Sequence, residues 1–568
     1  MSLYAHGVRT VFELPGGMTT HLLDSLHKLQ QIKIVTVHHE QAAAFAAEAV
    51  GRITGVPGVA LATSGPGATN LLTGIGSCYF DSSPSVFITG QVNQSEQKGS
   101  KPIRQLGFQE TDIVSMAQTI TKAAWRITTA EEIPAVIDRA FALAVSGRPG
   151  PVLLDIPMDV QRMDISVPAS LEAETSQPVT APVAVATVDE SLQAALATSK
   201  KPLILIGGGI RAGNAVEELE EFLNLTGIPV VNSLMAMDVL PYGHRLRVGM
   251  IGSYGNRWAN MALATSDLLI VLGSRLDVRQ TGADTDFFRQ HRVIFHVDCE
   301  IGELNNRVTG CSAIHADIRS FLSAACKKFS QAEFPDRTTW IEEIHSLRLL
   351  HSDLLELPNI KGINPNAFMH QLSVASSGAG AYVVDVGQHQ MWSAQSMEIC
   401  QGQRWMTSGG MGAMGFSLPA GIGACFALDR RPVVIVAGDG SFQCNLQELQ
   451  TVVRNKLALK IIIINNRCHG MVRQFQESYF HSQYQSTLWG YDTPDFVKVS
   501  QAYGIPARLV SSASEIEDGL KFLWEDPSTP ALLEVMVDTY TNSYPKIAFG
   551  KPLDQMEPDA KPLDMEGT

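Results

Sequence analysis

The chain has 568 residues, of which 45% are hydrophobic, and a formal net charge of −14. This length predicts three or four domains, each with enough hydrophobic residues for its own core. The acidic excess argues against nucleic acid or an anionic membrane as the main partner. Eight scattered cysteines without a CxxC pair favour free thiols over a disulfide framework or a zinc site. No signal-peptide pattern opens the sequence and its apolar runs are strand-sized, so we expect a cytoplasmic protein without membrane spans.

Short β-branched runs alternate with helical stretches along the whole chain. This pattern predicts an α/β fold of three consecutive doubly wound domains with mainly parallel sheets. The first ten residues read as the end of an amphipathic helix, and residues 167–188, rich in Pro, Ala, Thr and Val, read as a linker. The first domain is expected at residues 1–165, with strands at Ile34–Val37, Gly58–Ala62, Val86–Thr89 and Val152–Asp155.

Two further domains and a tail are expected after the linker. The second spans residues 188–330 and opens with the strand Pro202–Ile206. The third spans residues 363–550, where near-continuous apolar strands indicate a sheet covered on both faces. Residues 551–568 are polar and proline-spaced, which predicts a lid or a loose end. The strands of the third domain are expected at Tyr382–Asp385, Val433–Ala437 and Lys460–Ile464.

Two polar motifs follow neighbouring strands of the third domain. Asp439 lies in the GDGSF turn after one strand, and Asn466 follows the next strand along the chain. Because ligands of open α/β sheets bind at the carboxyl ends of strands, we expect these side chains to lie together. Carboxylate, amide and carbonyl oxygens suit Mg²⁺ shared with a diphosphate, and Cys468 can supply the carbonyl. Gly440 and Ser441 would let the backbone approach phosphate oxygens. A glycine turn alone is an ordinary strand end, but this combination resembles the fingerprint of thiamin diphosphate (ThDP) and Mg²⁺.

A carboxylate near the N-terminus supplies the partner that ThDP requires. The aminopyrimidine ring becomes active only when a carboxylate hydrogen-bonds its nitrogen N1′. Glu40 lies between the strand-like segment IKIVTV and an Ala-rich helical segment that permits close packing. The alternative is that Glu40 is simply a first-turn acid favoured by the helix dipole. His38 and His39 lack the spacing of a helical metal pair and are interpreted as structural.

Several motifs occur in one order along the chain and together carry a family resemblance. They are HEQAAAFAAEA after His38, SGPGATN (Ser64 to Asn70), GFQET (Gly107 to Thr111), GQHQMW (Gly387 to Trp392), TSGGMGAMGF (Thr407 to Phe416) and the GDG and NN pair. The whole resembles acetolactate synthase and its carboligase relatives over nearly the full chain. The resemblance implies the ThDP-binding fold, ThDP and Mg²⁺ as cofactors, decarboxylation of pyruvate, and transfer of its two-carbon acetyl unit to an acceptor carbonyl.

The resemblance also implies roles for individual residues. In this family the pyrimidine-side Glu and the metal site of one active centre come from different subunits, so we expect a homodimer or homotetramer with active sites between subunits. Glu40 would contact N1′, with Phe108 and Gln109 near the reacting substrate. The remaining residues implied for ThDP and the metal are Gly387, Gln388, His389, Gly412, Met414, Gly440 and Ser441 for ThDP, and Asp439, Asn466 and Cys468 for Mg²⁺.

The second domain carries a candidate dinucleotide site. The strand, glycine turn and helix from Leu203 onward could bind a dinucleotide, although a lone glycine turn is weak evidence. The resemblance extends to the FAD-binding segments of acetolactate synthases, and arginines suit a pyrophosphate. FAD is expected in a non-redox role, because a carboligation transfers no net electrons. The residues implied are Arg148, Gly208, Ser233, Met235, Arg275, Arg279, Asp298 and Asp317.

Three departures from the family pattern concern the substrate. Phe475, in a pocket segment with Met471 and Val472, stands where the family has Trp, and Met158 stands where it has Lys. Residues 93–106 and the C-terminal lid also differ. The smaller Phe475 leaves room for a bulkier acceptor, and the acceptor is expected to be a 2-keto acid or another ketone or aldehyde such as a keto-sugar. The alternatives are a simple 2-keto acid decarboxylase, a flavin-dependent pyruvate oxidase or a non-catalytic paralogue. The intact Glu40, Asp439 and Asn466 argue against the non-catalytic paralogue.

Overall fold

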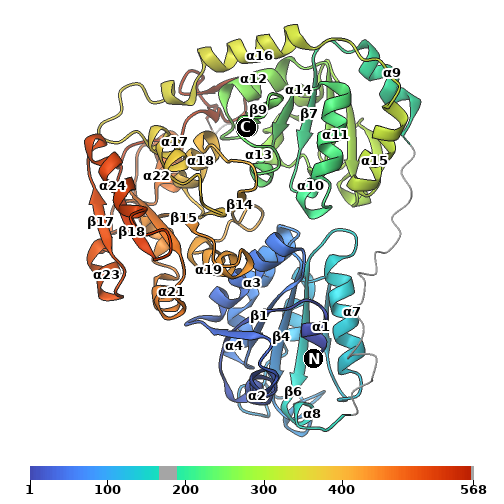
Figure 1. Cartoon of the computed structure of the whole chain (residues 1–568), viewed down its shortest axis with the longest axis vertical. Helices are drawn as coiled ribbons and strands as arrows, with labels where there is room; N and C mark the ends of the chain where they lie inside the picture. Colours follow the sequence, from blue (N-terminus) through green and yellow to red (C-terminus); the bar gives the residue numbers. More distant parts are fainter. Residues whose placement is uncertain (166–187, 565–568) are drawn as a thin grey trace.

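The computed structural model describes residues 1–165 and 188–564. Figure 1 shows three α/β units, with the first at the bottom, the second at the upper right and the third at the left. Each unit contains one six-stranded sheet, and all strand pairings described in these three sheets are parallel. The predicted fold class is confirmed. The predicted linker lies almost entirely outside the described residues.

The first sheet has the strand order β2-β1-β3-β4-β6-β5. Alternate residues of its strands enter two different cores: Phe12 packs under α3 and α5, and Val11 packs on the opposite face with α7. A short helix lies within residues 1–10. The strand β1 was not among the strands predicted from the sequence. The elements are β1 (Thr10–Leu14), β2 (Lys33–Thr36), β3 (Gly58–Ala62), β4 (Ser85–Gln91), β5 (Ala123–Arg126) and β6 (Pro151–Pro157), with α1 (Ser2–Ala5), α2 (Thr20–Leu29), α3 (Glu40–Thr54), α4 (Pro66–Asn70), α5 (Leu72–Phe80), α6 (Ile113–Ala117), α7 (Ile133–Val145) and α8 (Met158–Gln161).

The second sheet has the order β12-β11-β10-β7-β8-β9. Ile204 and Ile206 face α11 and α15, whereas Leu203 and Leu205 face α12 and α16, so this sheet is also covered on both faces. The elements are β7 (Pro202–Ile206), β8 (Val230–Asn232), β9 (Arg247–Met250), β10 (Leu268–Leu272), β11 (Val293–Asp298) and β12 (Ser312–His315), with α9 (Glu190–Thr198), α10 (Gly209–Ala212), α11 (Val216–Thr226), α12 (Arg257–Thr265), α13 (Val278–Thr281), α14 (Thr285–Arg289), α15 (Ile318–Phe329) and α16 (Thr338–Leu350).

The third sheet has the order β14-β13-β15-β16-β18-β17. Its central strands β15 and β16 are buried along their whole length, as the apolar runs predict. The elements are β13 (Ala381–Val384), β14 (Arg404–Met406), β15 (Val433–Gly438), β16 (Leu459–Asn465), β17 (Ala507–Val510) and β18 (Ala531–Met536), with α17 (Pro365–Ala375), α18 (Gln388–Ser396), α19 (Ser417–Ala427), α20 (Asp439–Phe442), α21 (Leu449–Asn455), α22 (Gly470–Tyr479), α23 (Phe496–Ala502) and α24 (Ile516–Leu523).

Helices α3 and α19 join the first and third units. A Cβ on Gly423 would lie only 2.1 Å from the Ala46 carbonyl oxygen, so the two backbones touch at this point. Beside it, the rings of Phe45 and Phe416 meet edge to face at 5.3 Å. The small residues around Glu40 therefore allow one continuous core to span both units.

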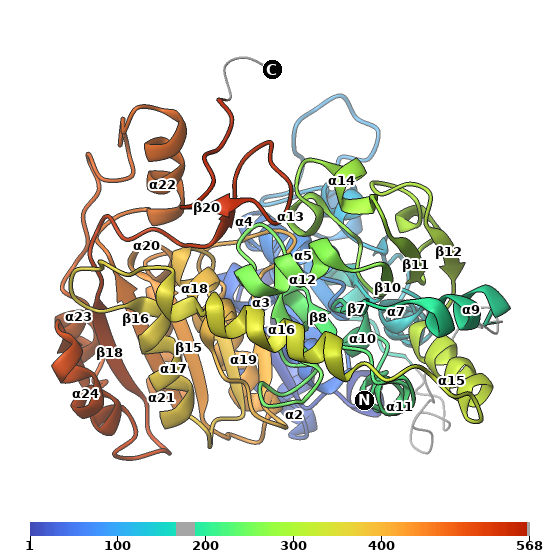
Figure 2. The ribbon, with the colours of Figure 1, turned by 90° about the horizontal axis from the view of Figure 1, so that it is seen from above.

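The C-terminal segment crosses from the third unit to the second, as the views in Figures 1 and 2 show. Strands β19 (Lys546–Ile547) and β20 (Met556–Glu557) pair antiparallel. The side chains of Ile547, Leu553 and Met556 enter the core of the second unit. The expected loose end is thus anchored over most of its described length.

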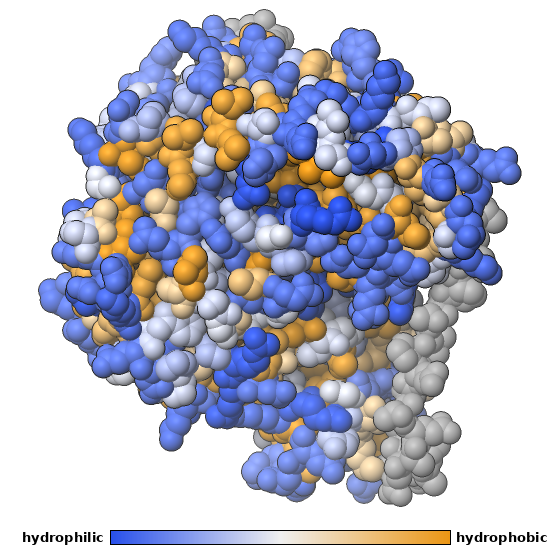
Figure 3. All heavy atoms as spheres, turned by 45° about the horizontal axis from the view of Figure 1, so that its top comes forward, coloured by the Kyte–Doolittle hydropathy of each residue, from blue (hydrophilic) through white to orange (hydrophobic). Residues whose placement is uncertain are grey.

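Hydrophobic and hydrophilic residues are interspersed over the face in Figure 3. Among the described residues, no helix has the length and apolar character needed to span a membrane.

Candidate active site

The carboxyl ends of β15 and β16 bring Asp439 and Asn466 together. These strands are adjacent and parallel, with Gly438 opposite Ile464. The backbone N–H of Asn466 donates to the carboxylate of Asp439. The backbone N–H of Cys468 in turn donates to the Asn466 side-chain oxygen over 3.2 Å. All three predicted metal-site residues therefore lie at one sheet edge, as the motifs predict.

Asp439 is almost fully buried. Burial raises the pKa of its carboxyl to about 7, although the Tyr491 hydroxyl and backbone N–H groups oppose the rise. Tyr491 donates to Asp439 Oδ2 over 2.9 Å, and its ring packs against His469. A nearby cation would stabilise the charged form of a carboxylate whose pKa is raised by burial in this way. Within the described chain, no group of three or more His, Cys, Asp and Glu side chains could hold a metal.

Helix α18 lines the same edge. Gln388 Oε1 accepts from Asn466 Nδ2 over 2.9 Å, and a Cβ on Gly438 would lie 2.8 Å from His389 Nδ1. Burial lowers the pKa of His389 to about 3, so its imidazole is neutral. Its Nε2 atom is buried without a hydrogen-bond partner in the described structure. A polar ligand group at this edge would satisfy that nitrogen.

A glycine-rich loop between β14 and α19 faces the site. Buried Asp385 holds the loop, because its carboxylate accepts from the backbone N–H groups of Gly415 at 3.0 Å and Ser417 at 2.8 Å. Gly412 has a φ of +66°, which disfavours any larger residue. Met414 is 38% exposed. An exposed Met on a firmly held loop is positioned to contact a ligand rather than to fill the protein core.

Glu40 is the first residue of α3 and is 5% exposed. Its Oε2 atom accepts from Asn70 Nδ2 over 2.9 Å, and a Cβ on Gly67 would lie 3.1 Å from Oε1. His39 caps α3 by accepting from the Gln41 N–H, which fits the structural role expected for it. Within the described chain, Glu40 makes its side-chain hydrogen bond with Asn70 and none with Asp439 or Gln388.

The remaining substrate-side residues are exposed, as Phe108, Val472 and Phe475 are, or half-buried, as Gln109 and Met471 are. Phe108 is 79% exposed, and Gln109 has a φ of +65°. Helix α22 carries Met471, Val472 and Phe475, of which Phe475 packs 4.9 Å from the Tyr479 ring centroid. These residues thus line open surface rather than the protein core.

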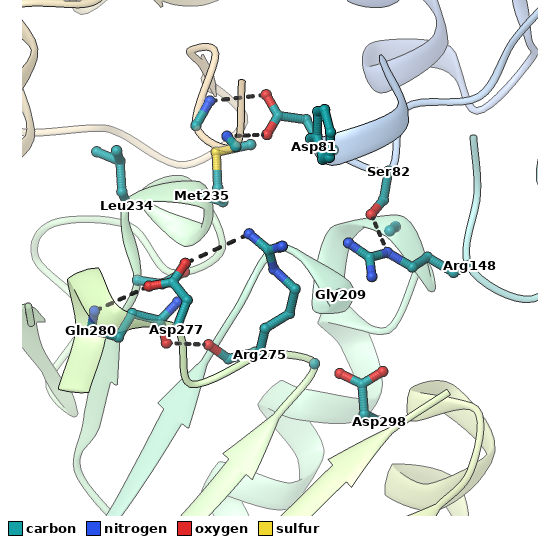
Figure 4. Close-up of a pocket in the computed structure, with 18 of the residues that line it drawn as sticks. Asp81, Ser82, Arg148, Gly209, Leu234, Met235, Arg275, Asp277, Gln280 and Asp298 are labelled. Atoms are coloured by element: carbon teal, nitrogen blue, oxygen red, sulfur yellow. Dashed lines mark hydrogen bonds and ion pairs between the residues drawn. The ribbon is translucent and has the colours of Figure 1, made fainter. Parts of the chain in front are cut away.

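A separate cavity lies where the three units meet (Figure 4). Its volume is about 180 Å³, and the space within it reaches about 1320 Å³ when the open mouth is included. A Cβ on Gly209 would lie 2.7 Å from Gly273 Cα, so the backbone is closely packed beneath the cavity. All eight residues predicted for FAD line it: Arg148, Gly208, Ser233, Met235, Arg275, Arg279, Asp298 and Asp317.

Polar contacts across this cavity reach the glycine-rich loop. Asp81 accepts from the Gly409 N–H at 2.9 Å and the Gly410 N–H at 2.6 Å. Arg279 donates to the Gly409 carbonyl over 2.9 Å. Figure 4 shows Arg148 beside Ser82, to which it donates over 2.8 Å. One peptide of the loop is therefore held from two different units.

The chain matches three family models. They are the N-terminal TPP binding domain of thiamine pyrophosphate enzymes at residues 2–116, the central domain at residues 190–325, and the C-terminal TPP binding domain at residues 385–535. It is 36% identical to the acetolactate synthase isozyme 2 large subunit of Escherichia coli K12, over 97% of this chain and 96% of that one. It is also 36% identical to the acetolactate synthase large subunit of Porphyra purpurea, over 99% and 95% of the two chains.

The chain belongs to the acetolactate synthase-like ThDP enzymes. It is therefore a ThDP-dependent enzyme of the carboligase type.

Three residues of this ThDP enzyme were not anticipated from the sequence. Asp385 ends a buried strand as Asp439 does, so the strand-end rule could have found it. Glu448 and Tyr491 gave no local signal, because their partners His38 and Asp439 lie elsewhere in the sequence.

Proposed function

We propose that this chain is a ThDP- and Mg²⁺-dependent carboligase that decarboxylates pyruvate and transfers the acetyl unit to an acceptor carbonyl. The observation that carries the proposal is the convergence of Asp439, Asn466 and Gln388 at one sheet edge. The relatives named above are acetolactate synthases, and this chain aligns with nearly their whole length. This similarity supports pyruvate as the donor.

The residues present fit both cofactor components. The Asp439 carboxylate, the Asn466 amide oxygen and the Cys468 carbonyl would hold Mg²⁺, since hard oxygen donors suit this ion. Gly387, Gln388, His389, Gly440 and Ser441 would hold the diphosphate. The unpartnered Nε2 of His389 supports this assignment. ThDP, when bound, supplies the thiazolium that accepts electrons as CO₂ leaves.

The chain's own residues would manage protons and geometry. Glu40 would exchange a proton with N1′ of the aminopyrimidine, and its burial keeps water from that exchange. Met414 and the Gly412 carbonyl would keep the cofactor bent, with the loop held by Asp385. Phe108 and Gln109 would orient the substrate.

The acceptor and the flavin belong to the same proposal. Phe475 is 38% exposed beside Met471 and Val472, which supports an acceptor pocket larger than one closed by Trp. The cavity at the junction of the units would hold FAD in a non-redox role, with Arg275 and Arg279 near its pyrophosphate. The free state of all eight cysteines supports action in the cytoplasm.

We further propose a homo-oligomer with active sites between subunits. Exposed hydrophobic side chains lie on the first and third units, and exposed apolar surface supports a protein interface. They include Tyr79, Phe80, Phe108, Met116, Met411 and Met414.

Turnover of pyruvate with ThDP and Mg²⁺, with products identified by mass spectrometry, tests the proposal. A carbon–carbon product, from pyruvate alone or with an added ketone, aldehyde or keto-sugar, is expected. Acetaldehyde as the sole product would instead indicate a simple decarboxylase. Glu40→Gln should abolish turnover and leave ThDP binding in calorimetry, whereas the exposed control Glu131→Gln should change neither. Failure of the wild type to bind ThDP would overturn the proposal.

A further inference from the structure

A second cavity lies in the middle unit, far from the flavin cavity in the fold. It is formed by residues 242–248, which lead into β9, by Pro229 before β8, and by helix α16. The flavin cavity includes Ser233 and Met250, at the opposite ends of the same two strands. The two cavities therefore open at opposite edges of one sheet.

The lining of this cavity is strongly basic in a chain whose net charge is −14. Within the described residues its walls contain no Asp or Glu side chain. The basic members are His244, Arg245, Arg247, His345 and Arg348.

Two arginines converge on one aromatic ring. The guanidinium carbons of Arg247 and Arg348 lie 5.3 and 4.9 Å from the centroid of Tyr242. Arg348 also donates to the Tyr242 hydroxyl over 2.6 Å. Two like charges held beside one ring repel each other unless an anion lies between or beside them.

The half-buried guanidinium of Arg247 makes no ion pair or side-chain hydrogen bond within the described structure. Burial and the neighbouring Arg348 lower its pKa to about 10. Its N–H donors therefore remain available to an anionic ligand that enters the cavity.

The acidic groups nearest to the cluster are already engaged. Glu220 pairs with His244 over 3.3 Å. Asp353 and Glu398 both bond His370, which packs on the other side of Tyr242. None of these three carboxylates makes an ion pair with Arg247 or Arg348 in the described chain.

We propose that this cavity binds the phosphate group of a small molecule through Arg247 and Arg348. Guanidinium groups present planar pairs of N–H donors that match phosphate oxygens. The cavity volume of about 280 Å³ admits either inorganic phosphate or the phosphate end of a nucleotide. The Tyr242 N–H bonds the Ile399 carbonyl over 2.8 Å, so the bound phosphate would lie at the junction of the second and third units.

Calorimetric titration of the holoenzyme tests this site. The enzyme is saturated with ThDP, Mg²⁺ and FAD so that the other two sites are filled, and is titrated with inorganic phosphate and separately with ADP at constant ionic strength. Saturable binding of at least one probe is expected; ADP binding alone would identify a nucleotide phosphate as the source.

The double variant Arg247→Gln/Arg348→Gln should weaken that binding at least tenfold, with an unchanged circular dichroism spectrum. Lys200→Gln, an exposed change of the same charge in the same unit, should leave it unaltered. If the double variant fails to fold, Arg348→Lys keeps the charge but loses the planar pair of donors and should still weaken binding several-fold. Absence of saturable binding in the wild type, or equal affinity in the folded variants, would overturn the site. A changed sedimentation coefficient without phosphate binding would overturn it in favour of a contact between subunits.

Discussion

Glu448 accepts a hydrogen bond from the backbone N–H of His38 over 2.8 Å, although 410 positions separate the two residues. The same carboxylate is fully buried and accepts from the Thr451 hydroxyl over 2.7 Å. Nearby, Asn445 donates to the Gln41 side chain over 3.1 Å. The loop that carries Glu40 is therefore positioned by the unit that carries Asp439.

Replacement of Glu448 by Ala should impair both stability and catalysis. The His38 N–H would lose its charged acceptor in a part-buried hydrogen bond, which costs roughly 1–3 kcal/mol of unfolding free energy. Because the loop before α3 would loosen, kcat should fall about tenfold or more while pyruvate binding changes less. Urea unfolding and steady-state kinetics measure the two effects. The exposed Glu517→Ala serves as the control, and an unchanged kcat in folded Glu448→Ala would contradict this role.

The buried Glu48 predicts a pH-dependent stability. Burial, with a contribution from Asp81, raises its pKa to about 7 from an ordinary value of 4.5, and Arg52 opposes the rise. The folded state therefore holds the proton more tightly than the unfolded chain, so this group lowers stability progressively as pH rises from about 4.5 to about 7.

Glu48→Gln removes that penalty. The variant should gain roughly 1–3 kcal/mol relative to the wild type at a pH well above 7, and little at a pH near 5. Urea midpoints at the two pH values test this difference, with the exposed Glu131→Gln as the control. A stability difference that does not vary with pH would refute the assignment.

Phe475→Trp should narrow the proposed acceptor pocket. The larger ring would fill space beside Val472, so the ratio of kcat/KM for a bulky acceptor to that for pyruvate as acceptor should fall about tenfold. Product ratios from mixed-acceptor assays measure it. Phe480→Trp is the matched control, because Phe480 belongs to the same aromatic group and is 51% exposed. Equal ratios in both variants would exclude Phe475 as a determinant of specificity.

Arg279→Gln should reduce flavin retention. This arginine lines the large cavity and donates to the Gly409 carbonyl, and loss of one charge-assisted contact should weaken FAD about tenfold. Flavin absorbance of the purified protein, followed by titration with FAD, measures the change. Arg289→Gln, an exposed change in the same unit, should retain wild-type absorbance. Equal flavin content in both variants would remove Arg279 from the proposed site.

The sequence patterns predict the central strands best. Gly58–Ala62 and Pro202–Ile206 begin and end as expected, because buried strands are continuous apolar runs bounded by polar or glycine residues. The strand β1 escaped prediction, since buried Glu13 interrupts its apolar pattern. The edge strand β14 was not predicted because it is short.

The residues of the candidate site likewise divide into those that the sequence predicts and those that it does not. Asp439 and Asn466 were predictable, because strand ends of one sheet meet at one edge. Glu448 was not, because its role depends on a tertiary contact with His38 between two units. The burial of Leu553 and Met556 in the tail was unpredictable for a similar reason, because they are isolated apolar residues whose buried partners lie in another unit.

The packing of that tail bears on how the protein is made. Ile547, Leu553 and Met556 complete a core that also contains Leu203 and Trp258. These two residues are synthesised long before the tail. Arg257 further binds Glu356 and the carbonyls of Met556 and Glu557. Domains generally fold as they emerge, N-terminal first. Here the middle domain would wait on the ribosome with an uncovered apolar surface until the tail has been synthesised, and chaperones have that interval in which to act.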